Sequence, residues 1–158
     1  KDGRYKMTPP SDKIFVDKDL LEVFLFNPEK DRARAFVCVY EEPLYGFAYI
    51  KRFTFGGMIN NKEYRLAPEK SKVLFFDEGC PEKLYVKFKP AKNQKIHQML
   101  FQPLEPVDKG AGEKKPLVEI RGATARGIQL TTKPIARISA TKGSWWNDGE
   151  AAAKGVLL

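Results

Sequence analysis

Two Arg-Gly pairs lie five residues apart in the stretch RGATARGIQL, residues 121 to 130. No acidic residue interrupts the window from 120 to 142 around them. Glycine lets a backbone turn tightly and approach a ligand closely, and the planar guanidinium of arginine can hold two phosphate oxygens. The window therefore predicts a phosphate-binding segment whose candidate residues are Arg121, Gly122, Arg126, Gly127, Lys133, Arg137 and Lys142.

Two further stretches, AYIKRFTF (48–55) and KLYVKFKPAKNQK (83–95), interleave cations with aromatic and aliphatic residues. Alternate residues of a strand face opposite sides, so one face can pack while the other presents cations. A solvated face is the usual role of a charged run, but the window from 83 to 99 also lacks acidic residues. A role in binding phosphates is therefore predicted for Lys51, Arg52, Lys87 and Lys89.

The net charge of the 158-residue chain is +8, and its pI is about 9.4. Residues 1–50 carry 8 basic and 9 acidic side chains (−1), residues 51–100 carry 11 and 5 (+6), and residues 101–158 carry 9 and 6 (+3). The positive field thus belongs to the later part of the chain, and it favours a polyanionic partner. No apolar run is long enough to span a bilayer, and a cytoplasmic location with no membrane partner is expected.

Residues that could perform catalysis are scarce. The single histidine, His97, lies among alternating apolar residues, and the two cysteines, Cys38 and Cys80, cannot form a disulfide framework. The glycine-rich turns lack the spacing of a nucleotide-binding loop, and no ligand set for zinc is present. The pair Arg4-Tyr5 is expected to be structural. We therefore expect neither catalytic residues nor metal ligands, and no cofactor bound by this chain.

Short runs rich in Val, Ile, Phe and Tyr, separated by Gly- and Pro-containing turns, predict an all-β protein. Only residues 91–101 fit a helix as well as a strand. The expected strands cover residues 14–26, 33–40, 46–55, 72–77, 83–90, 95–104, 116–122, 127–132 and 135–141.

Three of the basic strands resemble one another: GRYKMT, AYIKRFTF and LYVKFK. Aligning Lys6, Lys51 and Lys87 gives intervals of 45 and 36 residues, which is roughly the length of a four-stranded propeller blade. A row of cations repeated blade by blade would suit tracking of a DNA backbone. Residues 1–142 are expected to form the domain, with about three blades of which the first is incomplete, and residues 143–158 a flexible tail.

The segments DKDLLEVFLFNPEKDRARAFVCVYEEPLYGFAYIKRFTF, KEYRLAPEKSKVLFFDEG and PLVEIRGATARGIQLTTKPIARI, in this order, resemble the C-terminal domain of type IIA topoisomerase A subunits. These are the A subunits of DNA gyrase and of topoisomerase IV. RGATARGIQL resembles the blade signature R-x-A-x-G-x-x-G-I-x-L: Arg121, Ala123, Gly127, Ile128 and Leu130 match its ends, and one residue is missing from the middle.

The resemblance implies a β-pinwheel, a propeller-like disc whose neighbouring blades exchange strands, with few blades or only part of the disc in this chain. It implies a non-catalytic domain around whose basic rim double-stranded DNA bends. Its partners would be the catalytic domains of the A subunit, together with the ATPase B subunit. ATP and magnesium would be bound elsewhere in the topoisomerase.

In DNA gyrase this domain also carries a Q-R-R-G-G-R-G box, of which the present chain keeps only Arg126-Gly127. This departure favours a role like that of topoisomerase IV over DNA wrapping of the gyrase type.

Two other functions remain open from the sequence. One is a β-rich protein-interaction module whose charge serves solubility. The other is an OB-like single-strand binder with Phe53, Tyr85 and Phe88 as stacking platforms. For duplex binding, removal of Arg121 and Arg126 is expected to weaken affinity more than removal of Lys13 and Lys18, which have acidic neighbours.

Overall fold

The protein is all-β. The computed structural model describes residues 2–9, 20–27, 29–110, 112–149 and 152–154, and within them it contains strands, turns and irregular segments but no helix. The all-β prediction is therefore confirmed, and the ambiguous stretch 91–101 ends in a strand. No helix long and apolar enough to cross a membrane occurs in this described part.

The strands of the described residues are β1 (Arg4–Lys6), β2 (Ala35–Glu41), β3 (Ala48–Thr54), β4 (Glu63–Arg65), β5 (Lys72–Glu78), β6 (Leu84–Phe88), β7 (Gln98–Phe101), β8 (Pro106–Asp108), β9 (Lys114–Pro116), β10 (Ile120–Gly122), β11 (Ile128–Thr131), β12 (Ile135–Ser139) and β13 (Ala152–Lys154).

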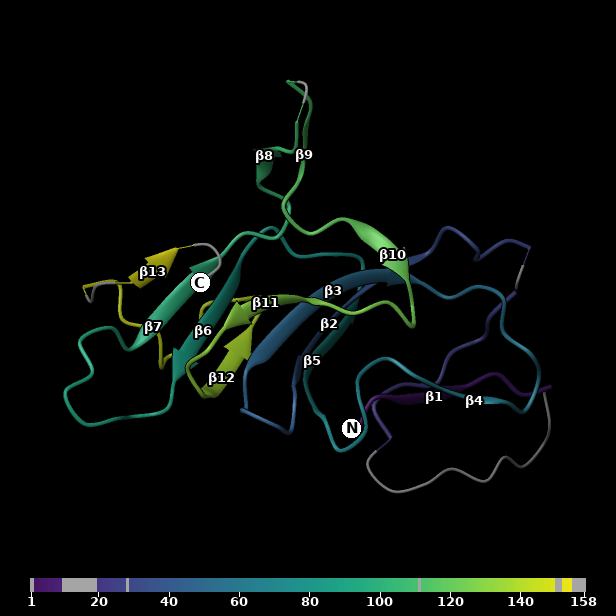
Figure 1. Ribbon diagram of the computed structural model, residues 1–158, viewed down its shortest axis with the longest axis horizontal. Helices are drawn as coiled ribbons and strands as arrows, with labels where there is room; N and C mark the ends of the chain where they lie inside the picture. The colour runs from purple at the N-terminus through teal and green to yellow at the C-terminus, as the bar shows by residue number, and fades with distance from the viewer. Residues whose placement is uncertain (1, 10–19, 28, 111, 150–151, 155–158) are drawn as a thin grey trace.

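Two larger sheets form the body of the molecule (Figure 1). In the first, here called the β3 sheet, β2 pairs antiparallel with both β3 and β5, and β10 and β11 both pair with the other side of β3. The second, the β6 sheet, has the order β12-β6-β7-β13. Neither sheet closes into a barrel, and the arrangement is compatible with a partial β-pinwheel.

Consecutive strands are shared between the two sheets. β11 pairs antiparallel with β3, whereas β12, which follows after three residues, pairs antiparallel with β6. In the same way β5 lies at the edge of the β3 sheet and β6 begins the next one. These crossings tie the sheets together, and they are the kind of strand exchange that the resemblance implied.

The main core lies between the two sheets. Alternating residues of β6 face it, as its burial pattern shows: Leu84, Val86 and Phe88 are at most 2% exposed. They pack with residues of β2, β3, β7 and β11 such as Val37, Ile50, Met99 and Leu130. Burial of these side chains supplies the main driving force for joining the sheets.

A second core covers the opposite face of the β3 sheet. It is aromatic and includes Phe36, Tyr40, Phe53 and Phe55, with ring centroids 5.0–6.0 Å apart for the pairs that Phe36 forms with Phe53 and Phe55. Both faces of β2 are therefore buried. This explains why its sequence, AFVCVY, is a continuous apolar run instead of an alternating one.

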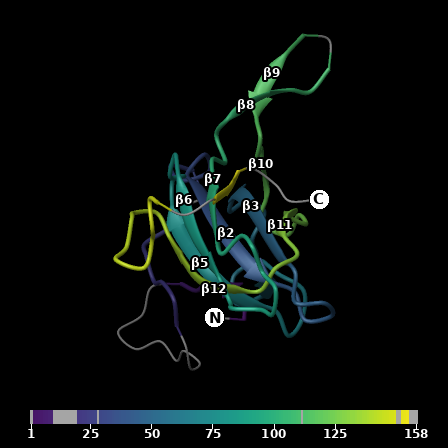
Figure 2. The ribbon, with the colours of Figure 1, turned by 90° about the vertical axis from the view of Figure 1, so that its left-hand side faces the viewer.

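Two small sheets lie outside this body. β1 pairs antiparallel with β4, which gives the N-terminal strand its partner. The β8–β9 hairpin projects away from the two large sheets (Figures 1 and 2). The strand predicted over 14–26 is absent from its described part, residues 20–26, where Phe24 and Phe26 pack on the aromatic core without a partner strand. Residues 14–19 lie outside the described residues.

Residues 143–149 pack on the β6 sheet. The fully buried Gln98 of β7 donates to the carbonyl of Asn147 (2.6 Å) and accepts from its backbone N–H (3.1 Å). The Trp146 ring meets Tyr85 of β6 edge to face at 5.0 Å, and β13 pairs parallel with β7. The division of the chain at residue 142 stays a prediction, but packed structure continues beyond it.

Replacing Gln98 with methionine tests this docking. Methionine fills a similar volume but leaves both backbone groups of Asn147 without a partner, and an unmade buried hydrogen bond costs about 1–3 kcal/mol. We expect the free energy of unfolding, measured by denaturant titration, to fall by that amount. The control Gln129→Met removes a half-buried amide without a described side-chain hydrogen bond, and it should cost less than about 0.5 kcal/mol. Equal losses in the two variants would contradict the proposed role of Gln98.

Candidate nucleic-acid interface

One segment, residues 120–139, links the two large sheets and carries most of the predicted phosphate contacts. It begins with β10, which pairs parallel with β3 so that Arg121 lies opposite Phe53. It continues through a loop and β11, still on β3, and then crosses to the β6 sheet as β12, where Arg137 lies opposite Lys87. One continuous segment thereby carries Arg121 on the β3 sheet and Arg137 on the β6 sheet.

The loop between β10 and β11 is held by a buried lysine. Lys51 of β3 is only 4% exposed, and its Nζ donates to the carbonyls of Ala123 (2.5 Å) and Ala125 (3.0 Å). The same amine lies 5.2 Å from the centre of the Phe53 ring. Burial lowers the pKa of Lys51 from its ordinary value of 10.5 to about 8. Lys51 was predicted as a phosphate contact, but the structure places its amine under the loop.

The end of this loop is fixed by three further contacts. A Cβ on Gly127 would lie 2.8 Å from the carbonyl oxygen of Ile50, so only glycine fits against β3 there. The Gly127 N–H donates to the hydroxyl of Tyr40 (3.1 Å), and the guanidinium of Arg126 lies over the Tyr49 ring at 5.3 Å. The sequence suggested that Gly127 approaches a ligand, whereas in the fold it approaches the neighbouring strand. The loop is therefore preorganised.

Gly122 differs from Gly127. No atom lies within 4 Å of the position that its Cβ would take, and its φ is not in the left-handed region. Its carbonyl accepts a hydrogen bond from Ala125 N (3.0 Å), a contact that any residue could make. The structure thus gives no steric reason for glycine at this position.

Arg121, Arg137 and Lys89 are exposed, and none of them forms an ion pair with another described residue. Four other described cations are matched with carboxylates: Arg4 with Asp2, Arg34 with Glu78, Lys109 with Glu119, and Lys115 with Glu113. Lys142 is also paired, because its Nζ lies 2.9 Å from Asp148. Within this window, Arg121 and Arg137 thus form no ion pair with another described residue, whereas Lys142 does.

The remaining predicted residues are half-buried. Arg52 donates to the carbonyl of Val118 (3.0 Å), and the Lys133 amine lies 5.3 Å from the centre of the Phe88 ring. Lys87 lies between Arg137 and Gln98 in the β6 sheet. The partners of Arg52 and Lys133 carry no charge, so they orient each cation without neutralising it.

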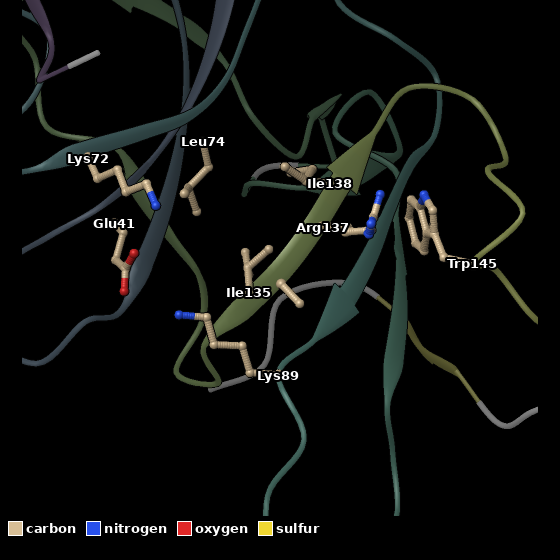
Figure 3. A pocket seen from close by; sticks show the side chains of 9 residues that line it. Glu41, Lys72, Leu74, Lys89, Ile135, Arg137, Ile138 and Trp145 are labelled. Atoms are coloured by element: carbon tan, nitrogen blue, oxygen red, sulfur yellow. The ribbon is translucent and has the colours of Figure 1, made fainter. Parts of the chain in front are cut away.

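Lys89 and Arg137 also line a depression of about 360 Å³ between the two sheets (Figure 3). Lys72 and Glu41 of the β3 sheet and the indole of Trp145 complete its charged and aromatic lining. Sequence reasoning did not select Lys72 or Trp145. Lys72 lies outside the two acid-free windows of the sequence, and Trp145 belongs to the stretch that was predicted to be a tail.

Groups that could act in catalysis are shielded. Burial raises the pKa of the Cys38 thiol to about 12 and also raises that of Cys80, so both thiols are protonated at neutral pH. No group of three metal-ligating side chains occurs among the described residues.

Exchange of each glycine for alanine separates their roles. Gly127→Ala forces a Cβ against the β3 backbone, and overpacking of this kind costs about 1–3 kcal/mol. Gly122→Ala enters open space and should change the free energy of unfolding by less than about 0.5 kcal/mol. Thermal and denaturant unfolding of both variants measures the difference. A Gly127→Ala protein as stable as the Gly122→Ala protein would show that the close approach is not present.

The buried amine of Lys51 predicts a pH dependence. Between about pH 8 and 10.5 the folded protein holds this amine neutral while the unfolded chain keeps it protonated, so unfolding takes up a proton and stability rises with pH. Relative to Lys51→Met, which cannot titrate, the wild type should therefore gain melting temperature as the pH rises from 8 to 10. The raised pKa of Cys38 acts in the opposite direction but is shared by both proteins. A difference that is flat over this range would contradict a depressed pKa.

Comparison with known proteins agrees with the resemblance seen in the sequence. A family model for the topoisomerase C-terminal domain of Bacteroidota matches residues 1–142. No curated protein and no solved structure matches the chain. The match is consistent with the C-terminal domain of a type IIA topoisomerase A subunit. The chain belongs to the topoisomerase C-terminal domain family, and it is a topoisomerase-associated DNA-binding domain.

Proposed function

We propose that this domain binds double-stranded DNA through its phosphates, without sequence preference. The observation that carries this proposal is that Arg121, Arg137 and Lys89 are exposed and form no ion pair with another described residue. Arg121 and Arg137 lie on the segment that links the two sheets, and the Lys89 N–H donates to the carbonyl of Pro134 in that segment (2.9 Å). Unpaired cations release the most counterions when they meet phosphates. The described residues also contain no helix that could read the major groove.

We further infer that the bound DNA bends. The linking segment presents Arg121 on the β3 sheet and Arg137 on the β6 sheet, so a duplex that contacts both must follow the rim from one sheet to the next. Bending over a short site costs on the order of 1–6 kcal/mol, which additional phosphate contacts can offset. Since the chain keeps only Arg126-Gly127 of the gyrase box, a role like that of topoisomerase IV is favoured over wrapping of the gyrase type.

In this proposal the domain is non-catalytic. It steers DNA for the catalytic domains of the A subunit, while the ATPase B subunit supplies ATP-driven motion with magnesium and ATP bound there. A cytoplasmic location follows from that role.

The single-strand alternative loses its stacking platforms in the fold. Phe53 and Phe88 are at most 2% exposed, and Tyr85 is packed against Trp146. A protein-interaction module would bind partners without the steep salt dependence of phosphate contacts, so salt titration separates it from DNA binding.

Duplex binding should be strongly dependent on salt. If about six phosphates are contacted, log K falls with log salt at a slope of about −5. The double variant Arg121→Gln/Arg137→Gln should lower the magnitude of this slope by about two, since each lost phosphate contact removes about one. Fluorescence anisotropy of labelled duplexes of two unrelated sequences at several salt concentrations measures both the slope and the lack of sequence preference.

The matched control is Lys109→Gln/Lys115→Gln, which removes the same charge from residues that are paired with Glu119 and Glu113. Its slope should stay close to that of the wild type. Lys13 and Lys18, which the sequence favoured for this comparison, lie outside the described residues. If both double variants lose the same amount of salt slope and keep the melting temperature of the wild type, DNA binding depends on the overall positive charge and not on contacts by Arg121 and Arg137.

A further inference from the structure

The depression between the two sheets has a lining suited to a phosphate with an attached apolar group. Its charged residues come from both sheets: Lys72 begins β5, Lys89 follows β6, and Arg137 lies in β12 (Figure 3). Its apolar residues are Leu74, Ile135, Ala136 and Ile138, and Trp145 lies on the same side as Arg137.

The charges of this lining do not cancel. The lining contains three cations, Lys72, Lys89 and Arg137, and one carboxylate, Glu41, which leaves a net charge of +2. None of the three cations forms an ion pair with a described residue, and Glu41 lies opposite Lys72 in the β2–β5 ladder without a salt bridge to it. Lys72 and Lys89 lie on the side of Glu41, whereas Arg137 lies across β12 beside Trp145 (Figure 3). An excess of cations along one surface raises the local concentration of anions.

The indole of Trp145, which forms the aromatic wall of the depression, is held in place by the residues on either side of it. A Cβ at Gly143 would lie 2.2 Å from Nε1 of Trp145, so the indole folds back over a position that only glycine leaves free. On the far side, the bonds between Gln98 and Asn147 fix the same segment to β7. The wall therefore exists before any ligand arrives.

We propose that this depression is an anion subsite for the DNA backbone, in which Lys72 and Lys89 hold one phosphate group and Arg137 holds a neighbouring one, with an adjoining sugar against Trp145. The subsite rests on the proposed function, and it adds Lys72 and Trp145 to the interface. A phosphodiester backbone alternates negative charge with apolar sugar carbons, which matches cations on either side of the apolar residues of β12 (Figure 3). Because the cations come from both sheets, a phosphate bound here also connects the sheets.

Tryptophan fluorescence reports on this subsite directly, because the chain has only two tryptophans. In Trp146→Phe the remaining indole is Trp145, and its emission should change when duplex DNA is added at low salt and return when salt is raised. In Trp145→Phe the remaining Trp146, which packs on Tyr85, should change little. Unchanged Trp145 emission at saturating duplex would overturn the proposal.

Single substitutions of the charged residues should change the affinity for duplex DNA in opposite directions. Lys72→Gln and Lys89→Gln should each weaken duplex binding and lower the magnitude of the salt slope by about one, whereas Glu41→Gln should tighten binding several-fold. Lys115→Gln and Glu113→Gln, from the ion pair of the β8–β9 hairpin, are matched controls that should stay near the wild type. Melting temperatures confirm that all variants are folded.

The outcomes distinguish the subsite from the proposed function. A wild-type protein without salt-dependent duplex binding overturns the proposed function. Normal wild-type binding with Lys72→Gln, Lys89→Gln and Glu41→Gln all unchanged overturns the subsite alone. Inorganic phosphate or a poly-glutamate peptide that shifts Trp145 emission at lower concentration than duplex DNA would overturn the assignment to the DNA backbone.

Discussion

The burial of the Lys51 amine under the loop between β10 and β11 is the interaction on which the interface depends. A cation removed from water needs hydrogen-bond partners, and here the carbonyls of Ala123 and Ala125 provide them. The cost of desolvation is visible in the lowered pKa of the amine. Because those carbonyls belong to the loop, satisfying the lysine also fixes the backbone that joins Arg121 to Arg126. A preorganised loop loses little conformational entropy on binding.

The same loop could not be placed without the sharing of strands between sheets. β10 and β11 both lie on the free side of β3, one parallel and one antiparallel, and β12 then continues the chain on β6. This path covers one edge of the β3 sheet and, through residues such as Leu130, fills the core between the sheets. The basic surface is therefore a consequence of how the sheets are joined.

The sequence predicted the strands well where side chains alternate against a core, as in β3 and β6, because this period is a local property. It did not show that Lys51 is buried. The loop that covers this amine lies more than 70 residues away in the sequence, so local alternation carries no sign of it. The aromatic residues Phe53 and Phe88 were interpreted as stacking platforms for a similar reason: the pattern shows which residues share a face but not which face is covered. The packing of residues 143–149 on β7 likewise depends on contacts 49 residues apart in the sequence.

The repeated lysines of the sequence do not form a row of exposed cations in the fold. Lys51 and Lys87 lie on strands that correspond in the two sheets, since each is flanked by a strand of the linking segment, yet Lys51 is buried and Lys87 half-buried. The linking segment contributes the exposed cations Arg121, Arg126 and Arg137. Uncharged aromatic rings position two cations of this segment. Arg126 lies over the Tyr49 ring and Lys133 over the Phe88 ring. An aromatic ring orients a cation but leaves its full charge, whereas a carboxylate orients and neutralises it at once. Binding to phosphates draws its free energy largely from released counterions. Rings and carbonyls fix the positions of the cations without neutralising them, so their charge stays available for phosphates.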